Sequence, residues 1–168
     1  MRVPAAGIYF PGEDRERILR AIDDTLKTGQ LTLGKHGKAF EEAFAARVGV
    51  KHAVAVNSGT SALEIILRIL GAERGEVVVP TNTFFATPAA VLHAGGRVRF
   101  ADIDANSLCL SAATLRAALG PNTVGVIIVH IGGLVAPDIE AIADLCRQRG
   151  IWLVEDAAHA QGSAARGR

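Results

Sequence analysis

Residues 152–159 of the chain read WLVEDAAH, an apolar run that ends in two acidic residues and is followed by a histidine. Aromatic and β-branched residues in a short run are typical of a buried strand, which we expect over residues 151–155. Asp156 then stands at the strand end, and His159 follows three residues later. A carboxylate removed from water needs hydrogen-bond donors or a cationic partner. Amides of the next turn could satisfy Asp156, so its meaning depends on the rest of the chain.

The pattern of a short apolar run followed by polar residues recurs along the chain. It predicts five strands, and helical spacing of apolar residues predicts four helices between them. The strands are expected at 53–56, 77–80, 97–101, 124–129 and 151–155, and the helices at 60–70, 83–93, 111–119 and 138–149. Nearly continuous apolar strands that alternate with helices favour a mostly parallel sheet with helices on both faces. The sequence therefore predicts an α/β fold with three α/β/α layers.

Two more helices are predicted before this alternation begins. Apolar residues recur at helical spacing over residues 13–28 and again over residues 40–48, and Gly29 and Gly49 are placed to end the two helices. A glycine-bearing loop over residues 30–37 connects them. We therefore divide the chain into a helical segment, residues 1–50, and an α/β part, residues 51–168.

Composition excludes several classes of function. The 168 residues carry a formal net charge of +1 with both signs interspersed, which argues against nucleic acid as a partner. No apolar run reaches membrane-spanning length, and the first residues do not form a signal sequence, so we expect a cytoplasmic protein. Cys109 and Cys146 are expected to be free thiols, and no spacing of cysteine and histidine predicts a metal site.

Three polar strand ends can be compared with the needs of a ligand. Because parallel strands bring their carboxyl ends to one edge of a sheet, residues 57–61, 81–85 and 156–159 can converge there. Gly59 lies between a predicted strand and the helix expected from Thr60, whose free N–H groups favour a phosphate, although an ordinary N-cap explains this segment equally well. We expect one ring of the Phe84–Phe85 pair in the core and the other free to stack on a planar ligand.

A phosphate-binding turn, an aromatic face and a buried Asp156 together describe a site for pyridoxal 5'-phosphate (PLP). The pyridine nitrogen of this cofactor stays protonated, and acts as an electron sink, when a carboxylate lies beside it. His159 alone is more simply a histidine without a function, but near Asp156 it can donate a hydrogen bond to a ligand oxygen. The combination is more specific than any of its parts.

The chain resembles the DegT/DnrJ/StrS-type sugar aminotransferases, which belong to the fold-type I PLP-dependent enzymes. The resemblance covers almost the whole chain and is carried by six blocks in order. They are TGQLTLG at 28–34, KHAVAVNSGTSAL at 51–63, VPTNTFFAT at 79–87, FADID at 100–104, VHIGG at 129–133 and EDAAHAQG at 155–162.

The resemblance implies a role for each candidate residue. Gly59, Thr60 and Ser61 would hold the cofactor phosphate, and Phe84 would stack on the pyridine ring. Asp156 would pair with the ring nitrogen, and His159 would bond the phenolic oxygen. A loop on the substrate side would comprise Leu31, Thr32, Leu33 and Gly34. The reaction implied is transfer of an amino group, usually from glutamate, to a keto group on a nucleotide-linked sugar, by a homodimer with composite active sites.

One departure from the family is the missing Schiff-base lysine. In the family this lysine lies beyond the Asp-x-x-His motif, whereas the lysines of this chain are Lys27, Lys35, Lys38 and Lys51. We therefore expect residues 51–168 to be an incomplete PLP-binding large domain, the small C-terminal domain to be absent, and the chain to be an N-terminal portion that does not transaminate alone. Two alternatives stay open: a non-catalytic remnant or regulatory module, and a relative of the PLP- or PMP-dependent sugar dehydratases.

Overall fold

The computed structural model describes residues 7–167, and the chain divides into two compact units between Ala55 and Val56. We call residues 1–55 the helical unit and residues 56–168 the sheet unit. No helix of the described residues combines the length and the apolar character needed to cross a membrane.

The helical unit contains the two helices that the apolar spacing predicts. They are α1 (Gly12–Thr28) and α2 (Lys35–Val48). Each ends at a glycine in the left-handed region, with φ of 71° at Gly29 and 76° at Gly49, which is the usual way to stop a helix. The apolar residues of α1 are largely exposed, and α1 buries no residue at all.

The sheet unit is built on four parallel strands in the order β2-β1-β3-β4. The strands are β1 (Glu76–Pro80), β2 (Arg97–Ala101), β3 (Thr123–Val129) and β4 (Trp152–Asp156). All carboxyl ends therefore lie at one edge of the sheet, as the alternation of strands and helices predicts.

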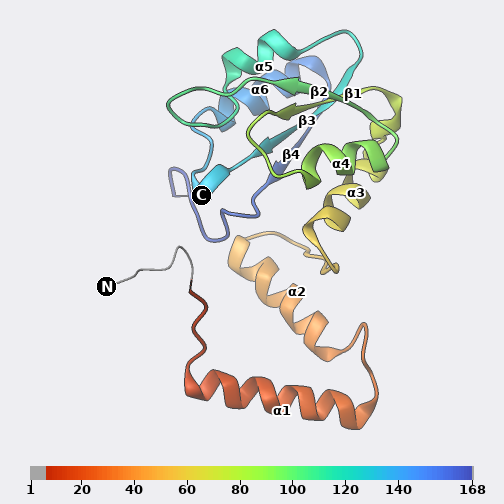
Figure 1. Ribbon diagram of the computed structural model, residues 1–168, viewed down its shortest axis with the longest axis vertical. Coiled ribbons are helices and arrows are strands. Elements are labelled where there is room, and N and C mark those ends of the chain that lie inside the picture. Colours follow the sequence, from red (N-terminus) through yellow and green to blue (C-terminus); the bar gives the residue numbers. More distant parts are fainter. Residues whose placement is uncertain (1–6, 168) are drawn as a thin grey trace. The chain divides into compact units, whose positions relative to one another are not determined.

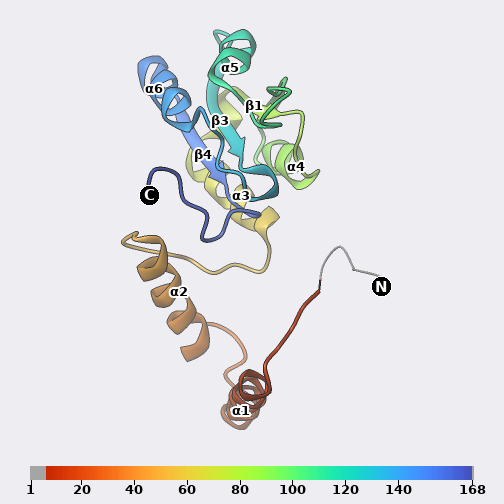
Figure 2. The ribbon, with the colours of Figure 1, turned by 90° about the vertical axis from the view of Figure 1, so that its left-hand side faces the viewer.

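Helices cover both faces of this sheet (Figures 1 and 2). One face packs on α3 (Gly59–Ile69) and α4 (Ala86–His93), and the other on α5 (Ala112–Ala118) and α6 (Ile139–Arg149). Because side chains of a strand alternate, Val77, Val79, Ile127 and Val154 join the first layer, whereas Val78, Val126 and Ile128 join the second. Short 3₁₀ turns lie at Ala72–Arg74 (η1) and Ile131–Gly133 (η2). The three-layer α/β/α prediction is confirmed.

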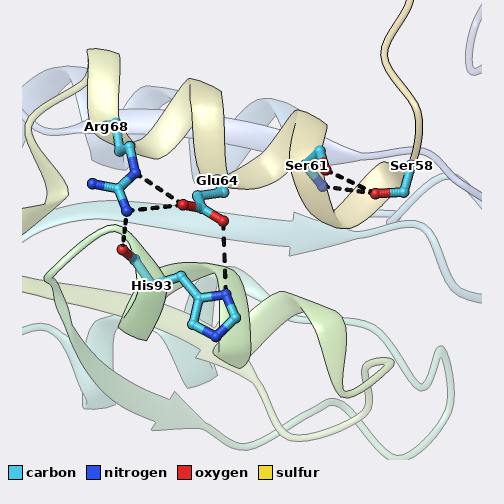
Figure 3. A network of polar contacts seen from close by, with 5 residues as sticks. All are labelled: Ser58, Ser61, Glu64, Arg68 and His93. Carbon is cyan, nitrogen blue, oxygen red and sulfur yellow. Dashed lines mark hydrogen bonds and ion pairs between the residues drawn. The ribbon is translucent and has the colours of Figure 1, made fainter.

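Polar contacts join α3 to α4 at their carboxyl ends (Figure 3). The guanidinium of Arg68 donates to Glu64 Oε1 at 2.8 and 3.0 Å and to the backbone oxygen of His93 at 2.5 Å. The other Glu64 oxygen lies 3.7 Å from Nδ1 of His93. These contacts link α3 to α4 beside the apolar packing between the two helices.

The prediction of a strand at residues 53–56 is wrong. This segment has no sheet partner among the described residues, and Val54 is 80% exposed, so neither hydrogen bonding nor burial stabilises a strand there. The sheet accordingly has four strands in place of the five expected.

The helix expected from residue 83 begins three residues later, at Ala86. The backbone N–H of Thr81 donates to Ala101, and the Asn82 side chain donates to the backbone of Leu108. These bonds draw the chain toward the end of β2 and delay the first helical turn.

Candidate functional site

A pocket of about 370 Å³ lies at the carboxyl edge of the sheet, on the α3–α4 face. Its lining includes five of the six residues proposed from the sequence as cofactor contacts. The lining residues are Gly59, Thr60, Leu63, Phe84, Ala86, Thr87, Asp156, Ala158 and His159. Segments separated by about a hundred residues thus line one pocket, because the carboxyl ends of parallel strands lie at the same edge of the sheet.

The amino end of α3 offers two free backbone donors to this pocket. The first four N–H groups of a helix have no partner within the helix. Here the N–H of Ser61 donates to Ser58 Oγ at 3.1 Å, and that of Ala62 donates to the backbone oxygen of Ser58. Among the described residues, the N–H groups of Gly59 and Thr60 have no acceptor. They are the two residues of this turn that line the pocket, and the positive end of the helix dipole favours an anion beside them.

Ser58 and Ser61 form the helix cap and leave the pocket lining to their neighbours. Ser58 adopts the extended N-cap conformation, and its hydroxyl also donates to Ser61 Oγ at 3.0 Å, as Figure 3 shows. The N-cap interpretation of the sequence therefore holds for Ser58. Ser61 belongs to this cap and does not line the pocket.

Both phenylalanines after β1 are exposed, which corrects the expectation that one of them lies in the core. Phe84 is 76% exposed and Phe85 77% exposed. The chain bends at residues 81–83 before α4 begins, so neither ring lies in the helix that the sequence predicted from residue 83. Phe84 alone of the pair lines the pocket, where its ring is available to a planar ligand.

Asp156 is the last residue of β4, and both of its carboxylate oxygens accept hydrogen bonds. Oδ1 accepts from the backbone N–H of Ala158 at 3.1 Å, and Oδ2 accepts from the Thr87 hydroxyl at 3.4 Å. The Thr83 hydroxyl donates to Thr87 at 2.8 Å, which leaves the Thr87 proton for Asp156. The side chain is partly buried and not fully buried as expected. This chain of hydroxyls orients a carboxylate that still has acceptor capacity toward the pocket.

His159 lies in the turn after β4 and contacts the turn after β3. The backbone N–H of Gly132 donates to His159 Nδ1 at 3.2 Å. The other ring nitrogen, Nε2, has no partner among the described residues. His159 therefore has one nitrogen committed to the protein and one open to a ligand.

His130 and Glu155 form a second polar pair, on the α5–α6 side of the sheet. His130 is nearly fully buried; its Nδ1 accepts from the Ala136 N–H at 3.1 Å, so its Nε2–H donates to Glu155 at 2.9 Å. This hydrogen bond lowers the pKa of Glu155 against the opposing effect of burial. The pair holds the end of β4 from the face opposite Asp156.

Thr87 and Gly132 are contacts that the sequence did not single out. Thr87 stands four residues after Thr83, a spacing that would place both on one face of the helix expected from residue 83, and this was the signal available for Thr87. Gly132 belongs to the VHIGG block at residues 129–133, but the sequence assigned it no contact. Leu31, Thr32, Leu33 and Gly34 lie in the helical unit, along a separate hollow of about 290 Å³, and their role stays a prediction.

Comparison with known protein families matches residues 12–168 to the DegT/DnrJ/EryC1/StrS aminotransferase family. The spore coat polysaccharide biosynthesis protein SpsC of Bacillus subtilis is 42% identical over 84% of this chain and 36% of its own length. A UDP-N-acetyl-3-dehydro-alpha-D-glucosamine 3-aminotransferase of Acidithiobacillus ferrooxidans is 39% identical over 92% of this chain and 42% of its own length.

A solved structure extends the likeness to three dimensions. The ntda protein of Bacillus subtilis, solved with the bound cofactor PMP, aligns with a TM-score of 0.82 and 30% identity over 88% of this chain and 34% of its own. The chain spans about two fifths of the length of the curated relatives it matches. With a family match over nearly all of its residues, the chain belongs to the DegT/DnrJ/EryC1/StrS aminotransferase family.

Proposed function

We propose that this chain supplies the noncovalent part of a PLP site in a sugar-nucleotide aminotransferase. The observation that carries the proposal is the meeting of Asp156, Phe84, His159 and the amino end of α3 around one pocket. These groups offer an anion acceptor, an aromatic face, two backbone donors and an imidazole. PLP presents the complementary groups: a protonated ring nitrogen, a planar ring, a phosphate and a phenolic oxygen.

Each residue has a binding task in this proposal. The free N–H groups of Gly59 and Thr60, with the Thr60 hydroxyl, hold the phosphate, and Ser61 supports them by closing the helix cap. Phe84 covers one face of the ring. Asp156 accepts a hydrogen bond from the protonated ring nitrogen, and His159 donates one to the phenolic oxygen.

The bound cofactor supplies an electron sink, whose strength depends on a protonated ring nitrogen. The task of Asp156 is to keep that proton in place, and the Thr87 and Ala158 bonds keep the carboxylate oriented for it. Residues 52–168 contain no lysine, so the residues around this pocket bind and orient. We propose that the amine that anchors the cofactor and moves the substrate proton comes from outside these residues.

The substrates we propose are a nucleotide-linked keto sugar and an amino-acid donor, for which the family resemblance favours glutamate. Support comes from the relative named for a UDP-linked 3-dehydro sugar. We place Leu31, Thr32, Leu33 and Gly34 on the substrate side. A homodimer in the cytoplasm completes the proposal.

Binding of pyridoxamine phosphate (PMP) to the purified 168-residue chain tests the proposal. PMP is the probe because its amine cannot form imines with the four lysines of the chain, which PLP would do. Isothermal titration calorimetry is expected to give saturable binding that weakens at least tenfold in Asp156→Asn, the loss expected for one charge-assisted hydrogen bond.

The matched control is Asp104→Asn. Asp104 also accepts several hydrogen bonds, from Asn106 and Ser107, but it does not line the pocket. It should leave PMP affinity unchanged. Equal affinities of the wild type and Asp156→Asn, or no binding at all, would contradict the proposal.

A further inference from the structure

The hydrogen bond between Gly132 and His159 carries an inference about which ring nitrogen of His159 bears the proton. A backbone N–H can only donate, so the nitrogen 3.2 Å from it, Nδ1, must present a lone pair. A neutral imidazole carries one proton, which is then on Nε2. The nitrogen left for a ligand is therefore a donor.

The turn that supplies this amide is itself held firmly. The His130 N–H donates to the backbone oxygen of Asp156 at 3.1 Å, and the Ser163 hydroxyl donates to that of Gly133 at 2.8 Å. These bonds tie the segment after β3 to the end of β4 and to the chain that follows it. The Gly132 amide thus meets His159 from a backbone fixed on both sides.

Glycine is required in this turn for two reasons. Gly132 has φ of 61° and Gly133 has φ of 87°, in the left-handed region that other residues adopt at a cost. A Cβ on Gly133 would also lie 3.1 Å from the backbone oxygen of His159. The pair therefore permits a close approach between the two strand exits.

We propose that the backbone amide of Gly132 is a positioning group that fixes His159 as the Nε2–H tautomer, so that this side chain offers the ligand a donor and no acceptor. With Asp156 as an acceptor in the same pocket, the site selects a ligand that carries an acceptor oxygen and an N–H group at separate positions. The identity of that ligand as PLP or PMP rests on the proposed function. The tautomer does not.

The direct test is nuclear magnetic resonance of the ligand-free, 15N-labelled chain. Free imidazole already favours Nε2–H, so the decisive signal is a through-hydrogen-bond 15N–15N coupling between the Gly132 amide and His159 Nδ1. The bond from the Ala136 N–H to His130 Nδ1, at 3.1 Å, has the same donor and acceptor types and is an internal control. Coupling at both histidines is expected. Coupling at His130 without coupling at His159 would overturn the inference.

Two substitutions of His159 that differ from one another only in the donor group test the role of the Nε2–H donor. His159→Gln can accept from Gly132 with Oε1 and donate with its amide nitrogen, whereas His159→Glu can accept but not donate. We expect PMP affinity within about threefold of wild type for Gln and at least tenfold weaker for Glu, the loss of a hydrogen bond to a charged oxygen. Equal affinities of the two variants would overturn the role of the donor.

The two proposals fail in different ways. If the wild-type chain shows the Gly132–His159 coupling but does not bind PMP, the PLP site fails and the tautomer stands. If the wild type binds PMP in an Asp156-dependent manner and the coupling is absent at His159 alone, the proposed function stands and the positioning role of Gly132 fails.

Discussion

At Gly59 the fold tolerates a side chain, but the proposed ligand does not. Its backbone does not require glycine, since its φ is not positive and a Cβ built there meets no atom within 4 Å. The open space lies at the pocket lining, where the proposal puts a phosphate. A methyl group would leave the protein undisturbed and occupy room that the ligand needs.

Gly59→Ala is therefore expected to weaken ligand binding without lowering the stability of the fold. Replacing glycine in the first turn of α3 should leave the free energy of unfolding unchanged or raise it by up to about 1 kcal/mol. PMP affinity should fall at least tenfold, about 1.4 kcal/mol. Urea denaturation and calorimetric titration measure the two quantities. Unchanged affinity would show that the phosphate is held elsewhere.

Thr87 offers a test of how Asp156 is held. Its hydroxyl is fully buried and connects Thr83 to the carboxylate. Thr87→Val keeps the shape and removes the donor, which should cost about 1 kcal/mol of stability and a few-fold in PMP affinity. Thr87→Ser should restore both.

Thr123→Val is the control for Thr87→Val. Thr123 is also buried, and its hydroxyl accepts from the Gly120 N–H at 3.0 Å at the opposite end of the sheet. Its loss should reduce stability and spare affinity. If both valine variants reduce affinity equally, the effect at Thr87 is only general destabilisation.

The lowered pKa of Glu155 makes the free energy of unfolding depend on pH. The hydrogen bond from His130 lowers its pKa below the ordinary value of 4.5. Below pH 4.5 the unfolded chain binds this proton before the folded chain does, so the stabilising contribution is complete above that pH and is lost as the pH falls through the folded pKa. Because the side chain is half exposed, we expect less than about 1 kcal/mol.

Glu155→Gln removes the titration and keeps an oxygen that His130 can bond. The difference in unfolding free energy between the wild type and this variant should be constant above pH 5 and shrink below pH 4.5. Chemical denaturation at a series of pH values measures it. A difference that stays constant down to pH 3 would assign the acid sensitivity to other groups.

At the scale of the elements, β3 packs against β4 because Gly125 has no side chain and leaves room for the indole ring of Trp152. Gly125 pairs with Trp152, and a Cβ at Gly125 would lie 2.1 Å from the indole ring. Gly125→Ala should therefore displace the indole and destabilise the sheet unit by about 1–3 kcal/mol.

A double-mutant cycle checks this explanation. Trp152→Leu removes the ring that the new methyl group meets, so the double variant should be less destabilised than the sum of the two single variants. Urea denaturation gives all four values. Additive effects would mean that Gly125 is required for a reason other than Trp152.

The elements that the sequence predicts correctly are those with a local cause. Gly29 and Gly49 end α1 and α2 because a glycine in the left-handed region stops a helix whatever surrounds it. The strands and helices of the sheet unit follow from continuous apolar runs and helical spacing in the same way. The parallel order then brings the strand exits to one edge, which is why candidate residues from distant segments share a pocket.

The features missed are those that depend on tertiary partners. Residues 53–56 have a strand-like composition, but a strand needs a neighbour, and none pairs with them among the described residues. Whether Phe84 or Phe85 is buried depends on where α4 starts. The hydrogen bonds from Thr81 and Asn82 decide that start, and both rings are exposed. The contacts of Thr87 and Gly132 likewise exist only once the two strand exits meet.

At the scale of the whole molecule, the two units differ in how they bury apolar side chains. The candidate cofactor residues all lie in the sheet unit, whose core has buried residues on both faces of the sheet. In the helical unit α1 buries nothing, and its residues Ile18, Ile22 and Leu26 line an apolar hollow of about 400 Å³. Exposed apolar surface of this kind favours association.

We therefore expect the 168-residue chain to self-associate with rising concentration, as sedimentation velocity would detect. Ile22→Glu with Leu26→Glu places charges on the apolar face of α1 and should return the chain to a monomer. Arg20→Glu changes the net charge by the same two units on the same helix, at a residue whose ion pair with Glu16 is highly exposed. It should leave association unchanged, because charge in general is not the cause. A wild-type chain that is monomeric at high concentration would show that this face does not drive association.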